Sequence, residues 1–253
     1  PMTAALGYHP NLFKSYDFQW TNMGLTAEKL SEDFGINRTE QDAFAMESNR
    51  RYFDACEAGF LTRERVPVTL PDGKVVTEDQ EPRLSTLESL SGLRTVFKEN
   101  GTVTAANSSG ISDGACMAWI GDQGTVEQSG KEPLAEIMTT ANVGLNPETM
   151  GLGPVSAIRK LLKMTGLSLD EIDLFEINEA FAVQVLACQR KLGIDETKLN
   201  IHGGAVALGH PLGMSGLRIA VTLAHSMDAQ NAHYGIASLC VGHGQGVAML
   251  LKR

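Results

Sequence analysis

The residues of this chain best suited to chemistry are a histidine and a cysteine, His210 and Cys240, each set among glycines. His210 lies in the glycine-rich stretch His202–Gly216, and Cys240 opens the stretch Cys240–Gly246. Because glycine has no side chain, such segments let a ligand come close to the backbone. An imidazole and a thiol that face one slot can exchange protons with carbon or sulfur. The pattern therefore indicates a proton-handling pair in a narrow site.

The elements that must position this pair are strands, because three polar residues each follow a predicted strand. Asn178 follows the run 172–177, His210 lies in the loop beyond 199–201, and Cys240 ends an apolar run of its own. Ligands bind at the carboxyl ends of strands in open α/β sheets, so we expect the three residues to converge. An amide and an imidazole N–H, directly or through a water, can hold a developing oxyanion.

The sequence predicts a change of organisation along the chain. Residues 1 to about 110 are expected to be mixed and rich in loops, whereas strands and helices alternate after about residue 130. This alternation predicts a mostly parallel sheet covered by helices, and an α/β fold. The expected helices are Thr26–Leu30 ending at Gly35, a helix from a capping box at Thr39–Asp42 to about Gly59, one with Pro154 in its first turn and Gly166 beyond its end, Glu179–Leu192, and Met214–Met227. The expected strands are Val66–Leu70 and Lys74–Thr77 in a hairpin, then Leu134–Val143, Ile172–Ile177, Tyr234–Cys240 and Gly246–Leu251.

Composition excludes two classes of function. The formal net charge of -9 and the absence of clustered basic residues argue against a nucleic-acid surface. No apolar run reaches the length of about 18 residues that a membrane span requires. The four scattered cysteines are typical of reduced thiols, so a cytoplasmic location, or the matrix of an organelle, is expected.

A metal site is the main alternative use of the same side chains. Cys240 and His243 are spaced as ligands can be, and His202 and His210 could add imidazoles. No second cysteine pair or carboxylate completes a tetrahedral set, so the sequence predicts no bound metal. Cys56, Cys116 and Cys188 are interpreted as small buried hydrophobic residues.

The chain resembles the thiolase family, and the resemblance extends along nearly all of it. The three carboxy-terminal signatures of that family are matched by Asn178–Ala182, Gly203–Gly216 and Cys240–Gly246, in the same order and with similar intervals. Supporting matches upstream are Met23–Glu28, Glu40–Phe44, Gly101–Gly110, Asp113–Gly114 and Met150–Pro154. Any one of these signatures is moderately specific, and the ordered set is much more so.

The resemblance implies a fold and a division into domains. A thiolase consists of two similar βαβαββ halves, and this chain would hold one complete half plus a mixed α+β loop domain. Residues 1–105 would be the loop domain on the CoA-binding side, residues 106–130 the last piece of the amino-terminal half, and residues 131–253 the carboxy-terminal domain.

The resemblance also implies a reaction, which is thiolytic cleavage of a 3-ketoacyl-CoA or the reverse Claisen condensation. His210 would activate the attacking thiol and help to bind the thioester oxygen, and Cys240 would be the acid/base. Asn178 would hold the oxyanion-hole water, and the Gly242 backbone N–H would serve a second oxyanion hole. The resemblance further places Ser109 at the pantetheine channel, Arg83 at the nucleotide end of CoA, Met23 near the acyl group and His243 at the pocket.

Two departures from the family pattern affect these expectations. His243 occupies a position where relatives have a small or aliphatic residue, so it would narrow the pocket or add a titratable group. No segment matches the one that carries the nucleophilic cysteine of a thiolase. We therefore expect a partner chain or fragment to supply that cysteine, within a dimer or tetramer of thiolase units. CoA and acyl-CoA would be substrates, and no cofactor would be bound permanently.

One alternative function remains open at this point, which is a catalytically silent CoA-binding or structural subunit. Retention of Asn178, His210 and Cys240 favours the active enzyme, because a silent subunit has no need for proton-transfer groups. Asn22 before Met23 favours the degradative direction slightly, and the acyl-chain length stays open.

Overall fold

A mixed sheet forms the centre of the carboxy-terminal part of the chain in the computed structural model, which describes residue 19 and residues 22–253. Its strands lie in the order β3-β6-β5-β4, and their bounds are Glu136–Gly144 for β3, Leu174–Ile177 for β4, Tyr234–Val241 for β5 and Gln245–Lys252 for β6. β6 is antiparallel to both β3 and β5, whereas β4 and β5 are parallel. The sequence predicted a mostly parallel sheet, and this prediction is wrong, because both pairings of β6 are antiparallel. A turn at residues 242–244 joins β5 to β6, and so short a connection makes neighbouring strands antiparallel.

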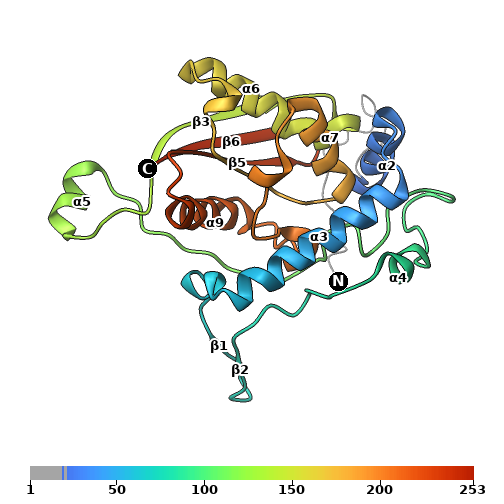
Figure 1. The fold of residues 1–253 in the computed structure, drawn as a ribbon, viewed down its shortest axis with the longest axis horizontal. Coiled ribbons are helices and arrows are strands. Elements are labelled where there is room, and N and C mark those ends of the chain that lie inside the picture. The colour runs from blue at the N-terminus through green and yellow to red at the C-terminus, as the bar shows by residue number, and fades with distance from the viewer. Residues whose placement is uncertain (1–18, 20–21) are drawn as a thin grey trace, which may run out of the picture.

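Helices cover both faces of this sheet, as predicted. α6 (Gly153–Thr165) and α7 (Ala182–Leu192) pack on one face, with Leu250 in the shared core. α9 (Ser215–Gln230) packs on the other face, where Leu251 joins the core. Successive residues of a strand point to opposite faces, so two neighbouring leucines serve two cores. Figure 1 shows α6 and α9 on opposite sides of the strands.

Two helices of the amino-terminal part begin after asparagines, and not at the residues that the sequence predicted. α2 (Met23–Phe34) is capped by the Asn22 side chain and ends at Gly35, as expected. α3 (Arg38–Glu57) begins with a capping box formed by Asn37 and Glu40, not at Thr39–Asp42. In each case the asparagine oxygen accepts a backbone N–H that the first helical turn leaves unpaired.

The remaining elements are short. They are β1 (Val68–Thr69), β2 (Val75–Val76), α4 (Leu87–Ser91), α5 (Gln123–Ser129), α8 (Ala205–Leu208), and 3-10 turns at Phe60–Arg63, Pro147–Leu152, Leu169–Glu171 and Glu196–Lys198. The hairpin of β1 and β2 confirms the predicted one, with two residues in each strand. The predicted strand at 199–201 is reduced to a single parallel bridge between Leu199 and Phe175. None of the helices in residues 22–253 is long and apolar enough to cross a membrane.

The start of α7 differs from the prediction by three residues. The backbone N–H of Asn178 continues the ladder to Ser238 O at 2.9 Å, and Ser108 forms a bridge with Phe181. These bonds keep residues 178–181 out of the helix, with Phe181 in an extended conformation, so the helix begins at Ala182 and not at Glu179.

The loop 101–110 is fixed by two carboxylates. Glu28 of α2 accepts the backbone N–H groups of Thr102 at 2.8 Å and Val103 at 2.9 Å. Asp42 of α3 accepts the Asn107 side-chain amide at 2.9 Å. The loop is thus tied to both amino-terminal helices.

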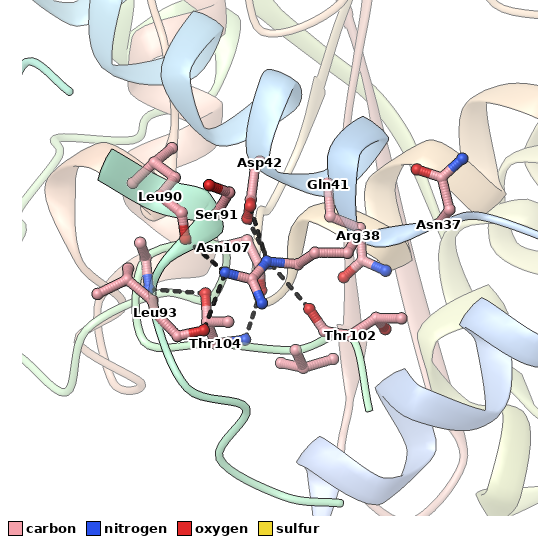
Figure 2. Close-up of polar contacts among 12 residues, drawn as sticks. Asn37, Arg38, Gln41, Asp42, Leu90, Ser91, Leu93, Thr102, Thr104 and Asn107 are labelled. Atoms are coloured by element: carbon pink, nitrogen blue, oxygen red, sulfur yellow. Dashed lines mark hydrogen bonds and ion pairs between the residues drawn. The ribbon is translucent and has the colours of Figure 1, made fainter. Parts of the chain in front are cut away.

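Asn107, which donates to Asp42, makes further hydrogen bonds within the loop, and Figure 2 shows it among the residues around Arg38. Its side chain also bonds Thr102 O at 3.1 Å and Thr104 N at 2.8 Å. Arg38 holds Asp42 from the other side, with Nε 2.7 Å from the carboxylate. Both Asn107 and Asp42 are almost fully buried. A buried polar group is stable only when its partners are present, so this network fixes the conformation of the loop.

Candidate active site

Asn178 and His210 meet, although 32 residues separate them in the sequence. Asn178 directly follows β4, and its side-chain Nδ2 lies 3.3 Å from Nε2 of His210. His210 is held by its backbone N–H, which donates to Gly110 O at 3.0 Å. The sequence prediction that these two residues converge is in agreement with this geometry.

Ser215 determines which nitrogen of His210 carries the proton. Its hydroxyl is 2.6 Å from His210 Nδ1 and donates to Pro211 O at 2.9 Å. Because that hydroxyl has a single proton, Nδ1–H donates to Ser215 and the Nε2 lone pair accepts from Asn178. Nε2 is therefore the nitrogen available to act as a base.

Burial keeps the His210 imidazole neutral. Desolvation lowers the pKa of His210, and the positive charge of Arg218 lowers it further. Both effects disfavour the imidazolium form. At neutral pH the side chain is thus poised to accept a proton.

Cys240 lies near the end of β5 and is 6% exposed. Burial raises the pKa of its thiol to about 12, so at neutral pH it is a protonated acid. It packs in one apolar cluster with Met23, Ala180 and Phe181. Met23 also limits the space at Gly242, where an added Cβ would lie 3.3 Å from the methionine sulfur.

Ser109 lies between the Asn178–His210 pair and the apolar cluster that contains Cys240. Its backbone N–H and its hydroxyl both donate to Ala180 O at 3.1 Å. The next residue, Gly110, accepts the His210 N–H, whereas Ala180 packs with Cys240. Through Ser109 and Gly110, the Asn178–His210 pair is thus linked to Ala180, which belongs to the same apolar cluster as Cys240 and Met23.

Arg83 and His243 are exposed and lie at the margin of this arrangement. The backbone N–H of Arg83 donates to Asn49 Oδ1 at 2.8 Å. Glu81, two residues before Arg83, does approach the site, because its Oε2 would lie 3.1 Å from a Cβ placed on Gly110. His243 stands in the β5–β6 turn with a φ of 67°, a left-handed conformation that is unusual for a residue with a side chain.

The sequence reading missed Ser215 and Glu179. Ser215 stands five residues after His210 at the start of α9, and Glu179 directly follows Asn178. Both lie inside the signatures that were singled out, so their position was a signal. The partners of Glu179 were not predictable, because its contacts with Ser48 and Val206 span 131 and 27 residues, whereas the partner of Ser215 is only five residues away.

The other cysteines occupy different environments. Cys188 on α7 is fully buried, its thiol donates to Gly151 O at 3.2 Å, and burial raises its pKa. Burial also raises the pKa of Cys116, and Cys56 accepts a hydrogen bond from Arg65 at 3.1 Å. Within residue 19 and residues 22–253, no group of three or more His, Cys, Asp or Glu side chains is arranged to hold a metal ion.

Similar proteins are found for both parts of the chain. Residues 11–122 match the model of the thiolase N-terminal domain, and residues 131–253 match that of the thiolase C-terminal domain. The chain is 45% identical to an acetyl-CoA acetyltransferase of Escherichia coli K12 over its whole length, and the match covers 62% of that protein. The chain thus spans about three-fifths of the length of the relatives that it matches.

Solved structures agree with the sequence matches. An acetyl-CoA acetyltransferase of Bacillus anthracis superposes with a TM-score of 0.86 and 42% identity, over 91% of this chain and 59% of that one. The human mitochondrial 3-ketoacyl-CoA thiolase in complex with CoA gives a TM-score of 0.85 and 41% identity, over 91% of this chain and 58% of that one. Together with the site geometry, these matches show that the chain belongs to the thiolase family.

Proposed function

We propose that this chain is the acid/base and CoA-binding part of a thiolase-type acyltransferase. The reaction would be cleavage of a 3-ketoacyl-CoA by CoA, or the reverse condensation of two acyl-CoA molecules. The observation that supports this best is the hydrogen-bonded series Ser215–His210–Asn178, which leaves Nε2 of a neutral imidazole as the base. The names of the relatives, which include acetyl-CoA acetyltransferases and thiolases, favour the same class.

His210 and Asn178 would act at the thioester. His210 Nε2 would take the proton of the attacking thiol and could then donate it toward the thioester oxygen. Asn178 Oδ1 is buried and accepts no hydrogen bond from the described residues. A buried carbonyl oxygen requires a donor, so we assign to it a water that would in turn donate to the oxyanion.

Cys240 would handle the proton at carbon. In the cleavage direction the bond between the two acyl carbons breaks, and its electron pair remains on acetyl-CoA as an enolate. The protonated Cys240 thiol would give its proton to that carbon, which the raised pKa supports by keeping the thiol protonated beforehand. The Gly242 backbone N–H would serve the second oxyanion hole, at the carbonyl oxygen of the acyl group that passes to the attacking cysteine.

The CoA substrate would lie along the remaining predicted residues. Ser109 would contact the pantetheine, Met23 would contact the acyl group, and Arg83 would meet the nucleotide end from its exposed position. His243 would border the pocket mouth. CoA is bound in the solved complex of the similar human enzyme, which favours CoA as substrate here, with no permanently bound cofactor.

The attacking cysteine would come from outside these 253 residues. Burial raises the pKa of Cys188 and Cys240, and a raised pKa makes a poor nucleophile. Apolar side chains of the segment 111–120 are exposed, as expected for a surface that a further part of a thiolase would cover. We infer that a segment or partner chain with the amino-terminal half completes the site, within a dimer or tetramer.

Labelling with acetyl-CoA tests this function on the assembled protein that contains the chain. Intact-mass analysis should find an acetyl adduct on a cysteine outside the 253 residues. The C240S variant should form the same adduct but lose roughly a hundredfold or more of its carbon–carbon bond cleavage, because the Cys240 thiol is proposed to give its proton to carbon and not to act on the cysteine that is acetylated.

Two outcomes would overturn the proposal. An assembled protein with neither adduct nor turnover would be a silent subunit. Equal loss of adduct formation and cleavage in C240S would contradict the acid/base role of Cys240.

We also propose a location for the protein. All four cysteines are free, and free thiols are typical of a reducing compartment, so we propose the cytoplasm or an organelle matrix.

A further inference from the structure

Glu179 is a buried carboxylate to which the proposed mechanism assigns no role. It is 1% exposed and directly follows Asn178 at the end of β4. It accepts hydrogen bonds from Ser48 Oγ at 2.7 Å, Asn200 Nδ2 at 2.9 Å and the Val206 backbone N–H at 3.0 Å. These donors belong to α3, to the turn before α8 and to α8 itself.

Each oxygen of this carboxylate accepts from an N–H group whose position can hold only a donor. Oε2 faces the Val206 backbone N–H. Oε1 faces Asn200, whose amide is held by Ile177, because Asn200 Oδ1 accepts from Ile177 N and Nδ2 donates to Ile177 O, each at 2.8 Å. A glutamine at position 179, or a protonated Glu179, would place an N–H or O–H group against one of these N–H donors. Only a carboxylate satisfies this site.

The backbone is shaped around this carboxylate. Gly204 precedes α8, and a Cβ there would lie 2.3 Å from Glu179 Cδ. α8 has no side-chain cap of the ordinary kind, and Glu179 bonds one of its first N–H groups instead. Burial raises the pKa of Glu179, whereas the hydrogen bonds from Asn200, Ser48 and Val206 act in the opposite direction.

The connections of Glu179 lead to both members of the Asn178–His210 contact. Asn178 is its neighbour in the chain, and α8 ends two residues before His210. A shift of α8 would move His210 relative to β4, and with it the 3.3 Å contact to Asn178. Catalytic groups tolerate displacements of well under 1 Å before the rate falls.

We propose that Glu179 is a positioning residue that holds His210 against Asn178 by bonding α8, α3 and the turn at Asn200 to the end of β4. This inference rests on the proposed function only for its kinetic consequence. The geometric consequence, which is the Asn178–His210 contact, stands without it.

The test compares E179Q with E171Q in the assembled enzyme. Glu171 is an exposed glutamate that also accepts a backbone N–H, from Ser168 at 2.8 Å, so it controls for the same chemical change at a surface cap. In E179Q we expect kcat to fall about tenfold or more, with KM for the acyl-CoA changed less than about twofold. In crystal structures of the two variants, the Asn178–His210 contact should open in E179Q and persist in E171Q.

A second variant covers the case in which E179Q does not fold. S48A removes the donor to Glu179, together with the hydrogen bond that Ser48 Oγ accepts from Gly204 N at 3.1 Å, and keeps the carboxylate with its Asn200 and Val206 bonds. We therefore expect kcat to fall by a smaller factor of roughly two to five. The proposal is overturned if both variants keep wild-type kcat, if kcat and KM change together, or if the Asn178–His210 contact is unchanged. A wild-type enzyme without thiolase turnover would instead remove the proposed function, while the crystal structures would still decide the role of Glu179.

Discussion

A single serine hydroxyl fixes which nitrogen of His210 carries the proton. Ser215 contacts Nδ1 of His210 at 2.6 Å, and the first turn of α9 holds it in place through Pro211 O. The sequence indicated His210, Asn178 and Cys240 because each ends a strand or lies in a glycine-rich loop. It did not indicate Ser215, because a serine at the start of a helix is usually no more than a capping residue.

Replacing this serine should therefore change catalysis and leave the fold intact. We expect S215A to lower kcat roughly tenfold or more, because Nδ1–H loses its partner and the tautomer is no longer fixed. Steady-state kinetics of the assembled enzyme measure the effect. S226A is a matched control, because Ser226 is equally buried on the same helix and bonds Thr222 O at 2.8 Å. An equal loss of activity in both variants would contradict the role of Ser215.

At the scale of elements, carboxylates of different helices converge on the loop 101–110. Glu28 and Asp42 hold it from α2 and α3, and the Asn107 carbonyl accepts the first N–H of α7, from Ala182 at 2.9 Å. The helices and strands were largely predictable from periodicity and from the residues at their ends, such as Gly35 and Gly166. The contacts of this loop were not, because they depend on residues far apart in the sequence. The antiparallel direction of β6 was missed although its cause is local, in the short turn at residues 242–244.

Asn107 offers a direct test of how strongly this loop is held. N107A removes three side-chain hydrogen bonds and leaves buried partners unsatisfied, so we expect the free energy of unfolding to fall by about 2–4 kcal/mol. Chemical denaturation measures this change. N146A is the control, because Asn146 caps an exposed turn through Glu148 N at 3.2 Å, and its loss should cost about 1 kcal/mol. Similar effects of the two variants would show that the buried network adds no special stability.

At the scale of the whole molecule, large apolar side chains remain exposed on the segment 111–120 and on β3. Ile111 is 98% exposed, Met117 93% and Trp119 61%, all in a segment without regular secondary structure. Ile137 of β3, a strand at the edge of the sheet, is 42% exposed. Exposed apolar side chains in this number are what a surface covered by a further chain segment would present.

The fluorescence of Trp119 should report whether the segment 111–120 becomes covered. In a W20F background Trp119 is the remaining tryptophan of the chain. On assembly with a segment that carries the amino-terminal thiolase half, its emission should shift to the blue and quenching by acrylamide should decrease. M164A provides the control, because Met164 is exposed on α6, outside this segment, and its loss should leave the shift unchanged. An emission spectrum that does not change on assembly would place the interface elsewhere.

The hydrogen bonds that build the site also determine when it can form. Glu28 reaches across 74 residues to Thr102, and Ser48 reaches across 131 residues to Glu179. Contacts between distant parts of a chain are slow to close, because the entropy of the long loop is lost before the contact stabilises it. During refolding, helices such as α3 and α9 can therefore form before Asn178 meets His210. The Asn178–His210 contact is thus a late product of folding, and its return marks completion of the native structure better than the return of helix content.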